Sequence, residues 1–237
     1  MSDKNVAIVL AGGRGKRMNI DVPKQYLEIN GRPLICYTLE AVENSIIDEI
    51  VAVVSKGEIE FFQNNIVNKY GYNKVTKIVE GGAERYNSVY NGLTAISEAT
   101  YVYIHDGARP CVDNEIIIRG YETVKKYKSA VAAVKVKDTI KKVDSEGFVI
   151  DTPDRNYLWQ IQTPQIFEYE KILNAYDNMN NSSDNICVTD DASVIELYGD
   201  GNVKIYEGSY NNIKVTTIED VSLVERIIKE NGDKSSF

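Results

Sequence analysis

Short apolar runs alternate with helical stretches along most of this chain, and no other feature limits its fold so strongly. The apolar runs have the length and the bounding turn residues of buried strands and lie at residues 6–10, 50–54, 74–79, 101–105, 130–134 and 203–207. The helical stretches lie at residues 33–44, 58–70, 86–97, 114–127, 191–198 and 218–230. Alternating βα units imply a mainly parallel sheet with helices on both faces. The sequence therefore predicts an α/β fold.

One segment interrupts this alternation. Between residues 137 and 150, two short strand-like runs flank the turn-rich sequence Asp144-Ser145-Glu146-Gly147, a pattern typical of a β-hairpin. We expect a protruding β-hairpin arm at about residues 137–165. No internal repeat and no linker rich in Pro, Gly or Ser divides the 237 residues, so we predict a single domain, 1–237, that includes the arm.

Composition excludes several classes of protein. Asp and Glu outnumber Lys and Arg by 35 to 27, giving a net charge of −8, so no broad basic face is available to a nucleic-acid backbone. The apolar runs are far shorter than the ~20 residues that cross a bilayer, and the N-terminus lacks the features of a signal peptide. We expect a cytoplasmic protein without a membrane or nucleic-acid partner. A single histidine and three widely spaced cysteines exclude a multi-histidine metal site and do not suggest disulfides.

A glycine-rich loop, Ala11-Gly12-Gly13-Arg14-Gly15-Lys16-Arg17, follows the first expected strand. Such a loop lets backbone N–H groups approach phosphate oxygens at the carboxyl end of a strand, where open α/β sheets bind their ligands. A tight strand-to-helix turn would use the same glycines. Three cations within residues 14–17, with Lys24 shortly after, favour a bound polyanion, because clustered positive charges repel one another without one.

Two common nucleotide-binding motifs do not fit this loop. The Walker A pattern GxxxxGK[ST] is absent. A dinucleotide fingerprint that began at Gly13 would place Met18 at its third glycine, and the strand at 50–54 ends in Ser55-Lys56 without an acidic residue for a ribose. A nicotinamide-dependent oxidoreductase is therefore disfavoured.

Two further motifs follow expected strands. The segment Gly81-Gly82-Ala83-Glu84-Arg85-Tyr86-Asn87-Ser88-Val89 opens a helix; its N–H groups and the Ser88 hydroxyl could contact a base or ribose, and an ordinary capped helix start fits equally well. In His105-Asp106-Gly107-Ala108-Arg109-Pro110, Asp106 ends an inner strand, a suitable place for a carboxylate that holds Mg²⁺ together with substrate phosphates. We interpret His105 as structural.

Six other segments join these motifs in a resemblance to a known family. They are, in chain order, Pro23-Lys24-Gln25-Tyr26, Asp138-Thr139-Ile140-Lys141, Thr152-Pro153-Asp154-Arg155-Asn156-Tyr157-Leu158-Trp159, Gln162-Thr163-Pro164-Gln165, Thr189-Asp190-Asp191-Ala192 and Asn212-Ile213-Lys214-Val215-Thr216. Together the motifs resemble the 2-C-methyl-D-erythritol 4-phosphate cytidylyltransferases of the non-mevalonate isoprenoid pathway. The resemblance covers nearly the whole chain.

The resemblance implies a three-layer α/β/α, Rossmann-like nucleotidyltransferase fold with a mixed, mostly parallel sheet. It implies a homodimer formed through the hairpin arm, each arm reaching into the partner's active site. The implied reaction transfers CMP from CTP to the phosphate of 2-C-methyl-D-erythritol 4-phosphate, giving 4-CDP-2-C-methyl-D-erythritol and pyrophosphate, with Mg²⁺ as cofactor.

The resemblance also implies roles for single residues, by their position in the motifs. The expected catalytic residues are Arg17, Lys24 and Lys214. The expected nucleotide-binding residues are Ala11, Gly12, Gly13, Gly15, Gly82, Ser88 and Asp106, and Asp106 is also the expected metal ligand. The expected substrate-binding residues are Arg109, Thr139, Arg155 and Thr163, with Thr139 and Arg155 supplied by the other subunit.

Two departures from the family pattern concern the acceptor. Ala11-Gly12 stands where the family often has two alanines, and Ala83 stands where an acidic residue is common. The Leu-Ala-Gly-Gly form is closer to the sister ribitol-5-phosphate cytidylyltransferases, which make precursors of cell-wall or capsule polymers. Residues 85–93 and 152–159 resemble the methylerythritol branch, which we favour over the ribitol alternative.

Overall fold

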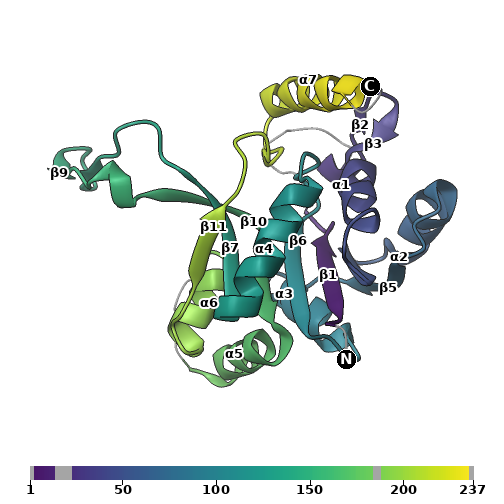
Figure 1. The fold of residues 1–237 in the computed structure, drawn as a ribbon, viewed down its shortest axis with the longest axis horizontal. Coiled ribbons are helices and arrows are strands. Elements are labelled where there is room, and N and C mark those ends of the chain that lie inside the picture. The colour runs from purple at the N-terminus through teal and green to yellow at the C-terminus, as the bar shows by residue number, and fades with distance from the viewer. Residues whose placement is uncertain (1–2, 14–22, 184–187, 235–237) are drawn as a thin grey trace.

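A seven-stranded sheet forms the centre of the computed structural model, which describes residues 3–13, 23–183 and 188–234 (Figure 1). The strands of this sheet are β1 (Asn5–Leu10), β4 (Glu49–Val54), β5 (Val75–Glu80), β6 (Tyr101–Asp106), β7 (Ser129–Lys135), β10 (Trp159–Glu168) and β11 (Lys204–Glu207). Their order is β11-β7-β10-β6-β1-β4-β5, and β10 runs antiparallel to both neighbours whereas every other pair is parallel. The expected mixed, mostly parallel sheet is confirmed.

Helices cover both faces of the sheet. The helices are α1 (Leu34–Glu43), α2 (Ile59–Phe62), α3 (Arg85–Ala95), α4 (Asn114–Tyr127), α5 (Tyr169–Asn181), α6 (Asp191–Tyr198) and α7 (Ile218–Lys234), with the short turns η1 (Lys24–Tyr26), η2 (Gln63–Asn68, a π-helix) and η3 (Arg155–Tyr157). Alternate residues of β1 point to opposite faces: Ala7 and Val9 pack with α1, α2 and α4, and Val6 and Ile8 pack with α3, α5 and α6. Both cores are thus built on strands that are apolar on both faces.

The end of the sheet that carries the loops after β1 and β6 has a third, smaller apolar cluster. Val224 and Ile227 of α7 pack there on Ile29 and Leu34, beside the small hairpin of β2 (Glu28–Ile29) and β3 (Arg32–Pro33). Among the described residues, no helix combines the length and the apolar character that a membrane span requires.

The hairpin arm projects from the body of the molecule (Figure 1). Its tip pairs β8 (Lys142–Val143) with β9 (Val149–Asp151), and its base is closed by a hydrogen bond from the amide of Val136 to the carbonyl of Leu158, 3.1 Å. From Trp159 onward the chain pairs with β7 as part of β10. The arm therefore ends near residue 158, earlier than the expected boundary at 165.

Two elements that the hydrophobic pattern did not predict are β10 and α5, and one predicted helix is irregular. The helix expected at 58–70 begins as α2 and continues as the π-helix η2. Along β10 the register against β7 shifts between Ile161 and Gln165. Within this irregular stretch, the Thr163 hydroxyl accepts a hydrogen bond from the amide of Asp106 at the end of β6.

Candidate active site

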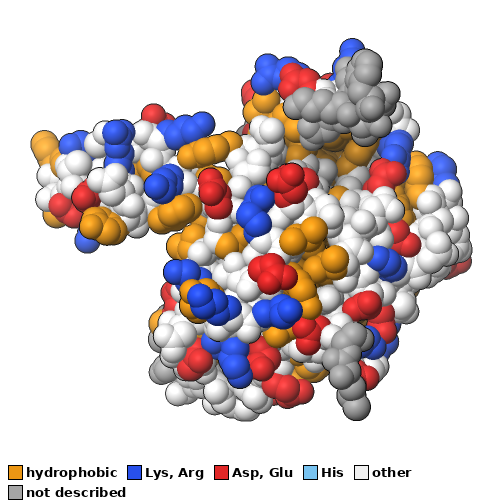
Figure 2. All heavy atoms as spheres, viewed as in Figure 1, with side chains coloured by type: hydrophobic (Ala, Val, Ile, Leu, Met, Phe, Trp, Pro, Cys, Tyr) orange, Lys and Arg blue, Asp and Glu red, His pale blue; other side chains and the backbone are white. Residues whose placement is uncertain are grey.

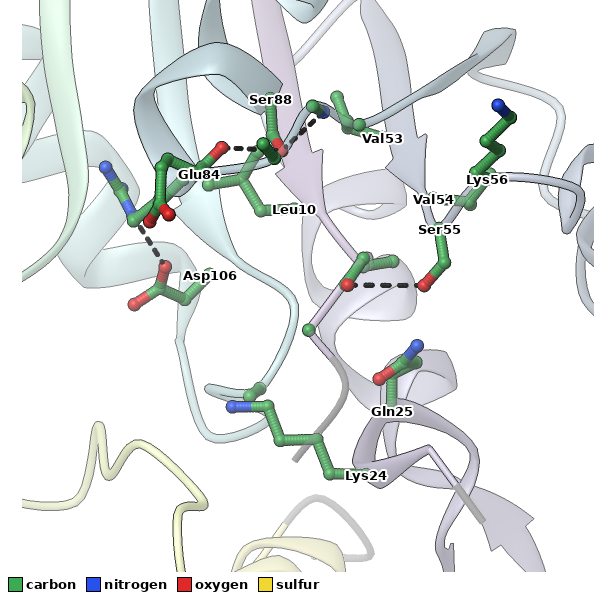
Figure 3. Close-up of a pocket in the computed structure, with 18 of the residues that line it drawn as sticks. Leu10, Lys24, Gln25, Val53, Val54, Ser55, Lys56, Glu84, Ser88 and Asp106 are labelled. Atoms are coloured by element: carbon green, nitrogen blue, oxygen red, sulfur yellow. Dashed lines mark hydrogen bonds and ion pairs between the residues drawn. The ribbon is translucent and has the colours of Figure 1, made fainter. Parts of the chain in front are cut away.

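A cavity of about 690 Å³ opens at the carboxyl ends of β1, β4, β5 and β6 (Figure 3). This is where open α/β sheets bind their ligands, because the loops after neighbouring parallel strands meet at one edge. The cavity is lined by Leu10, Ala11, Gly12, Gly13, Lys24, Gln25, Val53, Val54, Ser55, Lys56, Gly81, Gly82, Ala83, Glu84, Arg85, Ser88, Asp106, Ala108 and Lys214. Three motifs far apart in the sequence therefore form one site.

The glycine loop after β1 lies close to its neighbours. A Cβ atom on Gly12 would come within 3.3 Å of the carbonyl carbon of Val54, and a Cβ on Gly13 would come within 3.2 Å of Cε of Lys24. Glycine at these positions thus lets the loop lie against β4 and leaves room for the stem of Lys24. Gly15 and Arg17, both predicted site residues, lie outside the described residues.

The loop after β5 is held by Ser88. Its hydroxyl accepts a hydrogen bond from the amide of Gly82, 3.1 Å, and donates to the carbonyl of Glu84, 3.2 Å. A Cβ on Gly82 would collide with Cβ of Asn87, so only glycine fits here. Ser88, expected to contact the nucleotide, therefore also fixes the shape of the loop that lines the cavity.

Lys24 reaches the cavity from the single turn η1. Its ammonium group donates to the carbonyl of Val215 at 3.4 Å, and in Figure 3 its side chain extends into the cavity, on the side where Asp106 lies. Tyr26, at the end of the same turn, holds η1 in place. Its hydroxyl donates to Oε2 of Glu58, 2.9 Å, and its ring packs edge-on against Phe61. These contacts fix the base of the lysine side chain.

Asp106 is surrounded by three cations. Nζ of Lys214 lies 2.8 Å from Oδ2, Nε of Arg109 lies 3.6 Å from the same oxygen, and Nε of Arg85 lies 3.5 Å from Oδ1. Burial alone would raise the pKa of Asp106, but the positive charges around it lower the pKa well below the ordinary carboxyl range. The carboxylate is therefore ionised and orders the cations around it.

The loop that carries Lys214 is tied to the end of β6. The fully buried Asn212 donates from Nδ2 to the carbonyl of Thr163, 2.8 Å, and its own carbonyl accepts from a terminal nitrogen of Arg109, 2.7 Å. The amide of Val215 donates to the carbonyl of Ala108, 2.8 Å. The predicted residues Arg109 and Lys214 are thus brought together, and each is fixed by backbone contacts.

His105 and Thr163 form a buried relay beneath Asp106. Nε2 of His105 lies 3.3 Å from the carbonyl of Arg109, which can only accept, so this nitrogen carries the proton and Nδ1 accepts from the Thr163 hydroxyl at 3.0 Å. The Thr163 oxygen in turn accepts from the amide of Asp106, 3.0 Å. Burial lowers the pKa of His105 to about 4, so the ring is neutral, in agreement with a structural role. Thr163, expected to bind substrate, is itself buried here.

Thr139 and Arg155 do not reach the cavity of their own chain. Both are exposed residues of the arm segment, and the Arg155 guanidinium donates to the carbonyl of Lys137, 3.2 Å. Neither lines the cavity. Their position in the site of another subunit stays a prediction.

Sequence reasoning assigned no role to Arg85 and Asp191, although both stand in motifs quoted for the resemblance. The two terminal nitrogens of Arg85 lie 2.9 and 2.7 Å from the two carboxylate oxygens of Asp191. Asp191 is completely buried, and Arg85 also reaches Asp106. The motif Thr189-Asp190-Asp191-Ala192 was the available signal in the sequence, but Arg85 lies 106 residues away from Asp191.

The expected magnesium site depends on the carboxylates that face the cavity. Asp106 and Glu84 are the carboxylate side chains among the described residues that line the cavity, and Asp106 is already balanced by cations at 2.8 to 3.6 Å. No group of three or more His, Cys, Asp or Glu side chains that could hold a metal occurs in the described part of the chain. Among the described residues, Asp106 is thus at most a single carboxylate ligand beside substrate phosphates, and the expected magnesium site stays a prediction.

Comparisons of sequence and structure point to one family. The family model for 2-C-methyl-D-erythritol 4-phosphate cytidylyltransferase matches residues 5–230. Relatives of that name from Lachnospira eligens and Clostridium novyi are 50% and 48% identical over 226 and 227 residues, covering 95% of this chain and 99% and 97% of theirs. The structure of 4-diphosphocytidyl-2C-methyl-D-erythritol synthase from Anaerococcus prevotii is similar with a TM-score of 0.84 at 33% identity, covering 96% of both chains.

Proposed function

The chain belongs to the 2-C-methyl-D-erythritol 4-phosphate cytidylyltransferase family, and from this membership we infer that it transfers CMP from CTP to 2-C-methyl-D-erythritol 4-phosphate in isoprenoid biosynthesis. The products are 4-CDP-2-C-methyl-D-erythritol and pyrophosphate. The family match over residues 5–230 is the observation that carries this conclusion. The ribitol-5-phosphate alternative is not favoured, because the relatives of known name belong to the methylerythritol branch.

We propose that the cavity divides the chemistry between two sides. An oxygen of the acceptor phosphate attacks the α-phosphorus of CTP, and pyrophosphate leaves. Such a transfer requires two polyanions held in line and neutralisation of the charge that grows in the transition state. Lys24 supplies positive charge beside the glycine loop, where the triphosphate would lie. Lys214 and Arg109, ordered by Asp106, supply it where the acceptor phosphate would lie.

We propose that the glycine loop and the loop after β5 hold the nucleotide. Ala11, Gly12 and Gly13 line the cavity from the loop after β1, and Gly82 and Ser88 line it from the segment after β5. Gly15 extends this set by its position in the motif, and Arg17 joins Lys24 in stabilising the transferring phosphate. Backbone groups of glycine loops suit phosphate oxygens and the edge of a base, because no side chain separates them from the ligand.

We further propose that Mg²⁺ is used and enters with CTP, its ligands being mainly phosphate oxygens. This ion is commonly bound through substrate phosphates with few protein carboxylates. When bound, it would neutralise part of the triphosphate charge. The Asp106 carboxylate lies 2.8 Å from Nζ of Lys214. Its main role would then be to hold the neighbouring cations in place.

A homodimer with exchanged arms is also a proposal. Apolar side chains on and beside the arm are unusually exposed in the single chain, with 68% of Phe148, 60% of Ile150 and 83% of Tyr157 accessible, and Figure 2 shows hydrophobic groups along this projection. Exposed apolar clusters of this kind mark interaction surfaces. A second copy that covered them would also bring Thr139 and Arg155 to a neighbouring cavity.

We place the protein in the cytoplasm. The thiols of Cys36 and Cys111 are free and buried, as is usual in a reducing compartment.

Pyrophosphate release tests the proposed function. Purified protein is incubated with CTP, Mg²⁺ and either 2-C-methyl-D-erythritol 4-phosphate or ribitol 5-phosphate, and pyrophosphate is measured by a coupled assay. We expect efficient turnover with the methylerythritol substrate and at least about tenfold lower kcat/KM with the ribitol compound, a difference of about 1.4 kcal/mol. Equal or better use of ribitol 5-phosphate would overturn the acceptor assignment, and no release with either would overturn the transferase.

A further inference from the structure

Arg85 connects the reaction centre to a buried carboxylate that the proposed mechanism does not use. It is the first residue of α3, and its guanidinium spans two acids. The terminal nitrogens make a bidentate pair with Asp191 at 2.9 and 2.7 Å, and the remaining Nε–H lies 3.5 Å from Oδ1 of Asp106. In Figure 3 a dashed line at Asp106 marks this last contact.

Asp191, which holds the Arg85 guanidinium, is itself held firmly in place. Its side chain is completely buried at the start of α6, and the hydroxyl of Tyr176 on α5 donates to its Oδ1 at 2.7 Å. The preceding Asp190 caps α6 by accepting from the amide of Ser193, 3.0 Å, and accepts from Nε2 of Gln165 on β10, 2.9 Å. The position of Asp191 is thus set by α5, α6 and β10 together.

We propose that Arg85 is a positioning residue for the transfer reaction: held by Asp191, it fixes the Asp106 carboxylate and through it the ammonium group of Lys214. Asp106 has two oxygens and three cationic neighbours. Because Arg85 engages Oδ1, Oδ2 is directed toward Lys214 at 2.8 Å. Without Arg85 the carboxylate could rotate, and Lys214 would lose its fixed place.

In this proposal Arg85 acts on the substrate only through Asp106. Both terminal nitrogens of its guanidinium are engaged by Asp191, and its Nε–H faces Asp106. Lysine at this position would keep the charge but lacks the planar fork that reaches both carboxylates. The inference rests on the placement of Asp106 and Lys214 at the reaction centre under the proposed function.

A double-mutant cycle tests the proposal. Arg85→Lys, Asp106→Asn and the double variant are assayed for kcat with CTP and 2-C-methyl-D-erythritol 4-phosphate, at a temperature where circular dichroism shows each to be folded. We expect Arg85→Lys to lower kcat about 10- to 100-fold in the wild-type background and by less than about twofold in the Asp106→Asn background, because both changes remove the same interaction. Losses that multiply would overturn the proposal.

A matched control separates positioning from general loosening of α3. Tyr90→Phe removes the hydrogen bond from the Tyr90 hydroxyl to Asp177, 2.8 Å, which ties α3 to α5 without touching Arg85. We expect a lower melting temperature and unchanged kcat. A loss of kcat equal to that of Arg85→Lys would contradict the positioning role.

Two further outcomes complete the test. If Arg85→Lys does not fold, the double variant Arg85→Met, Asp191→Leu is used instead, because it replaces both charges by apolar groups, a change that proteins often tolerate. A loss of kcat of about 10- to 100-fold in this variant supports the proposal, and wild-type kcat overturns it. Wild-type turnover by Asp106→Asn would instead overturn the placement of Asp106 at the reaction centre, while the wild-type assay still reports on the transferase itself.

Discussion

Lys24 carries the charge on which the proposed transfer most depends. Lys24→Ala removes a cation beside the glycine loop, where charge grows on the transferring phosphate. Two unit charges about 4 Å apart interact by roughly 4 kcal/mol at an effective dielectric of 20, so we expect kcat to fall about 100- to 1,000-fold. Steady-state pyrophosphate release measures this, and the melting temperature shows whether the fold is retained.

Lys56 offers a matched control for this substitution. It also lines the cavity, but it is exposed and in Figure 3 its side chain points away from Lys24 and Asp106. We expect Lys56→Ala to leave kcat within about threefold of wild type, a difference of less than about 1 kcal/mol. A folded Lys24→Ala protein with near-wild-type kcat would remove Lys24 from the mechanism.

His105 predicts a pH dependence of stability. Its pKa is about 4 in the folded chain, because it is buried, against 6.5 for the free side chain, so the unfolded state binds more protons between these values. The contribution of His105 to the free energy of unfolding is present above pH 6.5 and is lost as the pH falls toward 4. It amounts to about 3 kcal/mol.

Denaturant unfolding at several pH values between 7 and 5 measures this effect. His105 is the only histidine in the chain, and carboxylates titrate mostly below this window. We therefore expect the free energy of unfolding to fall with pH in the wild type and to be nearly flat in His105→Gln. A flat wild-type profile would show that the folded ring is not held neutral.

At the scale of residues, the sequence pattern gives the position of a residue best where a motif ends a strand. Gly12, Gly13 and Asp106 follow or end apolar runs, and the fold brings them to one cavity together with Lys24. It located Thr163 but not its role, since the contact of its hydroxyl with His105 depends on how β10 pairs with β6. The pair of Arg85 and Asp191 was missed because it joins the starts of α3 and α6, whose contact also depends on the tertiary fold.

At the scale of elements, strands such as β1 and β4 were predicted because each is a nearly continuous apolar run. β10 was not, since its sequence Trp-Gln-Ile-Gln-Thr-Pro-Gln-Ile-Phe-Glu mixes amides and a proline with apolar residues. Its polar side chains are satisfied only in the folded protein: Gln162 donates to the carbonyl of Ser209, 2.8 Å, and Gln165 donates to Asp190, 2.9 Å. This strand is therefore specified by tertiary contacts more than by its own pattern.

The π-helix η2 and the arm show two other limits of pattern reasoning. Apolar spacing predicted a helix at 58–70 but not the change of hydrogen-bond pattern at residues 63–68. The arm was predicted from its turn-rich centre, Asp144 to Gly147, and Gly147 indeed has a positive φ of 90°, which favours glycine. Its C-terminal boundary was misplaced because β10 continues directly from the arm into the sheet.

Across the whole molecule, the arrangement of body and arm makes a prediction about how subunits share a site. The body of each chain holds Lys24 and Lys214 at its cavity, whereas Arg155 lies on the projecting arm and contacts its own arm backbone at Lys137. If arms are exchanged in a dimer, each cavity is completed by the partner's arm. Body and arm defects placed in different chains then compensate in one of the two sites.

Mixing Lys24→Ala chains with Arg155→Ala chains measures this compensation. After equal mixing and subunit exchange, about half of the dimers are mixed and each has one intact site, so we expect about a quarter of wild-type activity from two nearly inactive parents. Lys24→Ala mixed with Lys214→Ala is the matched control: both defects lie in the body, every site keeps one of them, and no activity returns. Native mass spectrometry confirms the mixed dimers; their presence without recovery, or a chain that remains monomeric, would contradict the exchanged-arm dimer.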